Sequence, residues 1–107
     1  MRERKILVVV LFLLLDVITA LPAAGDPEAG KLKAATCMGC HGVPSYQNVY
    51  PVYHVPRLGG QHAQYIVAAL NAYKKGERSH KTMQAQASGL SDQDMEDIAA
   101  YFEQHGK

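Results

Sequence analysis

Residues 37–41 read Cys37-Met38-Gly39-Cys40-His41, a C-x-x-C-H run that contains both cysteines of the chain. This spacing is typical of covalent haem attachment, in which two thiols add to the vinyl groups of haem and the following histidine ligates the iron. Because the chain has no second cysteine pair, it lacks the four thiolates of a structural zinc site. The run therefore predicts one haem c, bound covalently through Cys37 and Cys40, with His41 as an iron ligand.

The competing interpretation of the cysteine pair is a redox-active disulfide of the thioredoxin type. Such a motif is expected beside a β-α-β pattern, whereas the sequence around Cys37 shows no strand-like alternation of apolar and polar residues. We therefore favour haem attachment over a redox disulfide.

The start of the chain has the pattern of a secretory signal peptide. Basic residues are followed by an apolar stretch from Ile6 to Leu15 and then by several small residues. An uncleaved membrane anchor is the alternative, but Asp16 interrupts the stretch, which falls short of the roughly 20 apolar residues that span a bilayer. We expect residues 1–24 to be a cleaved signal peptide, with several possible cleavage positions, and residues 25–107 to form one small periplasmic domain.

The exported part of the chain is predicted to be helical, with three main helices. The first helix is expected to begin at Asp26, an N-cap followed by a proline at the first helical position. The second is expected to span about residues 61–75, where apolar side chains recur at helical spacing. The third is expected to follow Ser91, which can form a capping box with Asp94.

Two long loops are predicted between these helices. Residues 42–56 contain three prolines, and residues 76–90 contain two glycines and several small polar residues. The tyrosines of the first loop, Tyr46, Tyr50 and Tyr53, are expected to pack around the haem or to donate hydrogen bonds to it. A domain this short is only marginally stable on side-chain burial alone, so haem is expected to supply much of the core.

Taken together, this order of motifs resembles the class I c-type cytochromes, in particular the small bacterial periplasmic carriers and the single domains of their two-haem relatives. The resemblance covers essentially all of the chain after the signal peptide. The matching pieces are Gly30 seven residues before Cys37, the C-x-x-C-H-G run, the Pro-Arg-Leu-Gly-Gly-Gln segment at 56–61, Met83, and the patterns at 90–92 and 100–102.

The resemblance implies an all-α class I cytochrome c fold, with three main helices around one covalently bound haem. It also implies that the first and last helices cross at a right angle, with Gly30 allowing a close approach of Tyr101. A further implication is that the carbonyl of Pro56 accepts a hydrogen bond from the ring N–H of His41, which would hold the ring and raise its basicity.

Met83 is expected to be the second axial ligand of the iron. Met1 would leave with the signal peptide, Met38 lies between the two thioether positions, and Met95 belongs to the apolar stripe of the last helix. Met83 lies in the second predicted loop and matches the ligand methionine of the family. His80 is the main competing ligand and would give a bis-histidine site, whereas an open distal position would favour ligand sensing or peroxide chemistry.

His/Met ligation raises the reduction potential of haem iron and leaves no vacant position for a substrate. We therefore expect a periplasmic electron carrier and not an enzyme, with a dehydrogenase as donor and an oxidase or reductase as acceptor. Two alternatives stay open. The chain could be a cytochrome subunit of a larger oxidoreductase complex, or a haem sensor or peroxidase with an open distal site.

Basic and acidic residues are nearly balanced, with 11 Lys and Arg against 10 Asp and Glu. Nothing in this balance indicates a nucleic-acid partner, and no membrane span is expected after the signal is cleaved. Basic side chains gather before Met83, and acidic ones gather at the start of the last helix. A basic rim could steer an acidic redox partner, but the helix dipole explains the same placement of charge.

Overall fold

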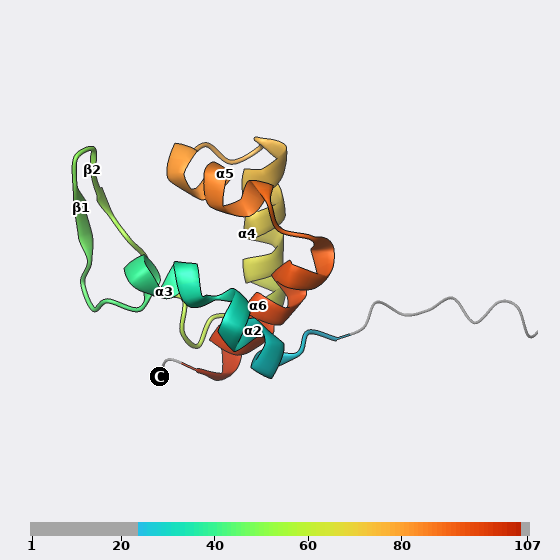
Figure 1. The fold of residues 1–107 in the computed structure, drawn as a ribbon. Helices are drawn as coiled ribbons and strands as arrows, with labels where there is room; N and C mark the ends of the chain where they lie inside the picture. The colour runs from blue at the N-terminus through green and yellow to red at the C-terminus, as the bar shows by residue number, and fades with distance from the viewer. Residues whose placement is uncertain (1–23, 106–107) are drawn as a thin grey trace, which may run out of the picture.

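The structure is a computed structural model, and it describes residues 24–105. The described chain folds into five helices and one two-stranded hairpin, in the order α2, α3, β1, β2, α4, α5 and α6 (Figure 1). The predicted signal peptide, residues 1–24, lies outside the described residues except for Ala24. Within residues 24–105, no helix is long and apolar enough to cross a membrane.

The predicted first helix is divided into two short helices, α2 (Pro27–Lys33) and α3 (Ala35–His41), which meet at Ala34. The start of α2 follows the prediction, because the carboxylate of Asp26 accepts a hydrogen bond from the backbone N–H of Glu28 at 3.0 Å. The C-x-x-C-H run forms the last turns of α3, so both thiols and the following imidazole are carried by one short helix.

The middle and last helices also follow the prediction. Helix α4 (Ala63–Lys75) ends at Gly76, whose φ of 76° provides the left-handed cap that glycine adopts without strain. Helix α6 (Asp92–Gln104) begins with the expected capping box. The N–H of Asp94 donates to Ser91 Oγ at 3.1 Å, and the N–H of Ser91 donates to Asp94 Oδ2 at 2.9 Å.

The prediction of a loop over residues 42–56 is wrong for part of that segment. Strands β1 (Gln47–Val49) and β2 (Val52–His54) form an antiparallel hairpin in which Asn48 lies opposite Tyr53. Its turn contains a cis peptide bond before Pro51. The prolines of this segment all lie outside the strands, where they remove no hydrogen-bond donor from the ladder.

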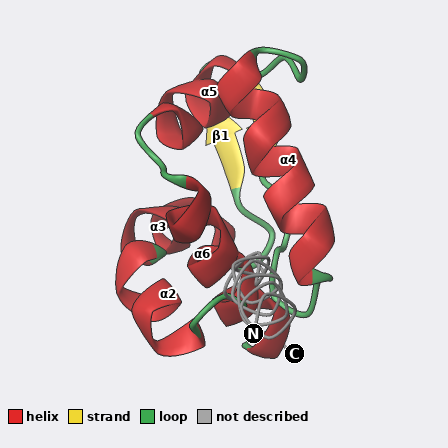
Figure 2. Ribbon diagram, turned by 90° about the vertical axis from the view of Figure 1, so that its right-hand side faces the viewer, coloured by secondary structure: helices red, strands yellow, loops and turns green. Residues whose placement is uncertain are grey.

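The prediction of a loop over residues 76–90 is also wrong for part of its length. Helix α5 (Lys81–Ser88) occupies the second half of this segment. Its side chains are mostly exposed, and Ala87 is its one buried residue. Figure 2 shows α5 at one end of the molecule beside α4, whereas α2 and α3 lie with α6 at the other end.

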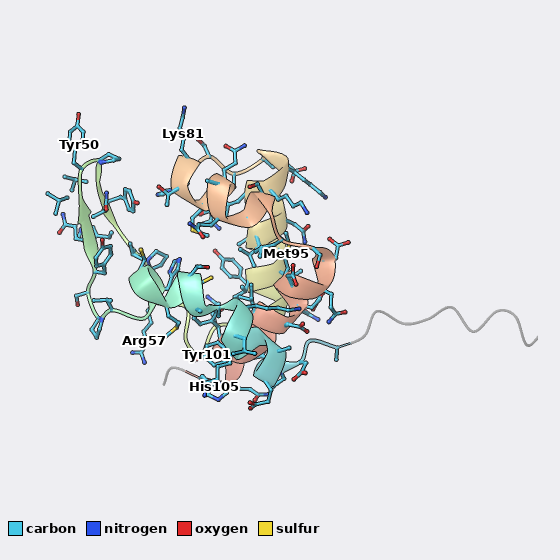
Figure 3. All side chains as sticks on the ribbon, viewed as in Figure 1. Tyr50, Arg57, Lys81, Met95, Tyr101 and His105 are labelled. Carbon is cyan, nitrogen blue, oxygen red and sulfur yellow. The ribbon has the colours of Figure 1, made fainter. Side chains whose placement is uncertain are left out.

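The hydrophobic core joins α4 and α6 to the start of α3 and the end of α5. Met95, which Figure 3 labels in the interior, is fully buried, as the apolar stripe of the last helix predicts. The buried apolar residues are Ala34, Ile66, Leu70, Ala87, Met95, Ile98, Ala99 and Phe102. This is a small core for one domain, and several of its members are alanines with little side chain to bury.

Helices α2 and α6 touch at a glycine. A Cβ atom at Gly30 would lie 1.9 Å from the carbonyl oxygen of Asp97 and 3.0 Å from the Cβ atom of Tyr101. Real side chains do not approach that closely, so the contact requires glycine. The close approach of Gly30 to Tyr101 that the family resemblance implies is therefore confirmed.

One buried carboxylate also ties α2 to α6. Asp97 is 3% exposed. It accepts hydrogen bonds from the backbone N–H of Asp26 at 2.8 Å, Lys33 Nζ at 2.6 Å and Gln93 Nε2 at 2.8 Å. Lys33 Nζ also lies 2.9 Å from Asp94 Oδ1. The hydrogen bond from Lys33 is the main reason that the pKa of Asp97 is lowered and that the pKa of Asp94 falls to about 2.

Candidate cofactor site

A cavity of about 420 Å³ opens among α3, the hairpin, α4 and α5. Its volume falls within the range of about 300–1,000 Å³ that is typical of ligand and cofactor pockets. The walls are mainly apolar and aromatic. All of the predicted site residues line this one cavity, although they come from distant parts of the sequence: Cys37, Cys40, His41, Pro56 and Met83.

The two cysteines lie on one wall of the cavity. They are three residues apart on α3, a spacing that places both side chains on the same helical face. Both are half-buried and form no disulfide. Burial raises the pKa of the Cys37 thiol, and a hydrogen bond with Thr36 offsets only part of that effect. Burial therefore favours the neutral form of the Cys37 thiol over the thiolate.

His41 follows the second cysteine and makes the hydrogen bond that the resemblance implies. Its Nδ1 atom lies 2.7 Å from the carbonyl oxygen of Pro56. Because a carbonyl oxygen can only accept, Nδ1 carries the proton, and the lone pair on Nε2 is left for a metal ion. This is the tautomer that a histidine ligand requires, and the hydrogen bond fixes the orientation of the ring.

Met83 lines the same cavity, although it is distant in the sequence from the two cysteines and His41. The residue is half-buried and packs against the hydrophobic core. It lies in the first turn of α5, and not in a loop as the sequence predicts. Of the other methionines in residues 24–105, Met38 is 38% exposed and Met95 is fully buried, and neither lines this cavity. Within the described chain, Met83 is thus the methionine that faces the site.

His80, the main competing ligand, also lines the cavity, but it is engaged in a second interaction. Its Nδ1 atom accepts a hydrogen bond from the backbone N–H of Met83 at 3.4 Å, so His80 is the N-cap of α5. Sequence reasoning missed this role. The usual signal for an N-cap is Ser, Thr, Asp or Asn, and histidine provides none.

The aromatic and basic side chains around the cavity are only partly as expected. Of the first-loop tyrosines, Tyr53 lines the cavity, whereas Tyr50 is 94% exposed and points away from the body at the hairpin tip (Figure 3). The hydroxyl of Tyr53 lies 3.3 Å from Thr82 Oγ1. Arg78 and Tyr73 also line the cavity, and the guanidinium of Arg78 lies 4.9 Å from the ring centre of Tyr73 in a cation–π contact.

These residues fit a covalently held haem. The cavity combines two thiols on one helix face, a histidine in the tautomer of a ligand, a soft thioether and a mainly apolar wall. Within residues 24–105 there is no group of three or more His, Cys, Asp or Glu that could hold a bare metal ion. The donors that do line the cavity, one imidazole and one thioether beside two thiols, are those that would hold a haem.

Comparison with known proteins agrees with this chemistry. A family model described as Cytochrome c matches residues 28–106. The chain is 44% identical to "Cytochrome c-554(548)" of Halomonas halodenitrificans, an alignment that covers 74% of this chain and 95% of that protein. It is 41% identical to "Cytochrome c4" of Pseudomonas aeruginosa, covering 90% of this chain and 46% of that protein.

A third relative, the "Thiosulfate dehydrogenase electron acceptor" of Thiomonas intermedia, is 34% identical over 75% of this chain and 34% of its own length. Among solved structures, cytochrome c4 of Acidithiobacillus ferrooxidans superimposes with a TM-score of 0.58 at 29% identity, covering 79% of this chain and 52% of that one. The chain thus spans nearly all of one relative and about half, or less, of the others.

Proposed function

This chain belongs to the cytochrome c family, with the class I fold and a haem c bound through Cys37 and Cys40, and from that premise we propose that it carries single electrons in the periplasm with His41 and Met83 as axial ligands. The haem supplies one iron that alternates between the ferric and ferrous states.

The observation that supports the proposal is that His41 and Met83 line the same cavity as the two thiols. The Pro56 carbonyl holds His41 with Nε2 available. The thioether of Met83 is a soft donor, which favours ferrous iron and raises the reduction potential. If His41 and Met83 both hold the iron, the site would leave no position for a substrate, which favours a carrier over an enzyme.

The walls of the cavity contribute by excluding water. Ile66 and Leu70 of α4 are buried and line the site, and Leu58 is half-buried beside them. An apolar surrounding of this kind limits solvent access to a metal centre and so tunes its reduction potential.

The proposal also covers the electron donor of this chain and its compartment in the cell. One relative is named as the electron acceptor of a dehydrogenase. By analogy we expect the donor of this chain to be a periplasmic dehydrogenase and its acceptor to be an oxidase or reductase. Export fits the start of the sequence, where a basic and then apolar stretch has the pattern of a signal peptide.

The optical spectrum of the oxidised holoprotein tests the ligand assignment. We expect a weak far-red band from sulfur-to-iron charge transfer, and we expect Met83→Ala to lose it. Met38→Leu is the matched control and should keep the band, because Met38 is exposed outside the cavity. Carbon monoxide should bind slowly to the reduced wild type and rapidly to Met83→Ala. A band that survives in Met83→Ala would overturn the assignment, and fast binding to the wild type would favour the sensor or peroxidase alternative.

A further inference from the structure

The residue that caps α5 is arranged to hold Met83. His80 has an extended backbone, with φ of −169°, and its ring turns back over the start of the helix. Its Nδ1 atom accepts from the Met83 N–H at 3.4 Å, and its carbonyl oxygen accepts from the Gln84 N–H at 2.8 Å. One residue thus satisfies two backbone donors in the first turn, one of which belongs to Met83 itself.

The ring of His80 is in turn held by two tyrosines from other elements. The ring centre of Tyr53 in β2 lies 4.7 Å away at an interplanar angle of 83°, and that of Tyr73 in α4 lies 6.4 Å away at 78°. Both are edge-to-face arrangements, which aromatic rings prefer over face-to-face stacking. Tyr53 also contacts α5 directly through Thr82, with 3.3 Å between the two hydroxyl oxygens.

Helix α5 needs such support. It has eight residues, one of them buried, and helices this short are marginal in water without tertiary contacts. Its position therefore depends on what holds its ends. At the N-terminal end that support is the His80 side chain and the tyrosines around it.

We propose that His80 is a positioning residue, which acts with Tyr53 and Tyr73 to fix the first turn of α5 so that the thioether of Met83 is presented to the haem cavity. This inference rests on the proposed ligation by Met83. It gives His80 a role other than that of a rival ligand, because Nδ1 is used for the cap. With Nδ1 as acceptor, the neutral ring carries its proton on Nε2.

Two substitutions at His80 test the proposal in the oxidised holoprotein. His80→Ala removes the cap, and we expect a weaker far-red band and cyanide binding that is about fivefold faster, the factor that corresponds to the loss of one helix N-cap. His80→Asn supplies another side chain that caps helices well, so it should restore the band and the slow cyanide binding. A purely structural role would change the unfolding midpoint and leave the band and the cyanide rate as they are.

His62→Ala is the matched control. His62 holds the same N-cap position on α4, but its side chain makes no capping hydrogen bond and does not line the cavity. We expect the band and the cyanide rate of this variant to equal those of the wild type. Wild-type values for both readouts in His80→Ala would overturn the inference.

The tautomer of His80 gives a second readout that needs no variant. Nitrogen NMR of the reduced holoprotein should find the proton on Nε2, and a proton on Nδ1 would contradict the cap even if His80→Ala failed to fold. Met83→Ala separates this inference from the function on which it rests. If Met83→Ala keeps the band, the ligand assignment fails, whereas loss of the band there with an unchanged His80→Ala refutes the positioning role alone.

Discussion

Gly30 of α2 lies directly against the backbone of Asp97 in α6, so close that a Cβ atom would stand 1.9 Å from the Asp97 carbonyl oxygen. Helix α2 leads at once into α3, which carries both thiols and His41. The contact between these two residues therefore sets where the cofactor-bearing helix lies relative to the core.

Gly30→Ala should force the two helices apart. We expect the free energy of unfolding of the holoprotein to fall by about 1–3 kcal/mol, the usual cost of overpacking a close contact. Denaturant unfolding measures it. Gly89→Ala is the control, because a Cβ atom there would have no neighbour within 4 Å. Equal midpoints for the two variants would contradict the role of the contact.

Asp97→Asn should also weaken the contact between α2 and α6, in this case by removing a buried charge. The substitution keeps the shape of the side chain but removes the charge that faces Lys33 Nζ at 2.6 Å. We expect a loss of about 1–3 kcal/mol in the free energy of unfolding, as for other buried groups deprived of a partner. Glu96→Gln, one position earlier, should stay within about 0.5 kcal/mol of the wild type. A similar loss of unfolding free energy in both variants would show that the interactions of Asp97 stabilise the fold no more than those of Glu96.

The free energy of unfolding should fall in acid because Asp94 and Asp97 become protonated. The pKa of Asp94 is lowered to about 2 in the folded chain, mainly by the hydrogen bond from Lys33, and that of Asp97 is lowered for the same reason. In the unfolded chain both revert to about 3.9. Their stabilising contribution is therefore complete above that value and is lost as the pH falls towards about 2.

The Lys33→Met variant isolates this effect. Without the ammonium group, the two folded-state pKa values move back towards those of the unfolded chain, so the variant should lose less stability than the wild type between about pH 5 and pH 2. Unfolding midpoints in denaturant across that range provide the comparison. Parallel curves for the two proteins would show that Lys33 does not cause the acid sensitivity.

The parts of the fold that the sequence predicts are those with local signals. The start of α6 follows from Ser91 and Asp94, three residues apart, and the attachment of the cofactor follows from the C-x-x-C-H run. Placing Met83 in the site needed more, namely the elimination of the other methionines and the resemblance to a family. The structure brings it to the same cavity as His41.

The parts that the sequence did not predict lack such signals. Helix α5 has one buried residue and a histidine cap, so neither an apolar stripe nor a usual N-cap marks it. The hairpin has strands of three residues and a turn at Tyr50 and Pro51 without Asn or Gly. Its apolar residues Val49 and Val52 are 83% and 67% exposed, whereas Asn48 and Tyr53 are the half-buried ones, so the hairpin lacks the apolar-in, polar-out alternation that marks a strand in a sequence.

The division of the first helix is a third such case. Ala34, where α2 and α3 meet, is a strong helix former and gives no sign of a break. The residue is fully buried in the core. The break therefore depends on tertiary packing, which a single sequence does not display.

The mass of the purified protein under denaturing conditions tests the central claim most directly. We predict one species with the mass of the processed polypeptide plus one haem, because thioether bonds at Cys37 and Cys40 survive unfolding. A species with the mass of the polypeptide alone, with the red pigment released into the solvent, would contradict covalent attachment and the electron-carrier function built on it.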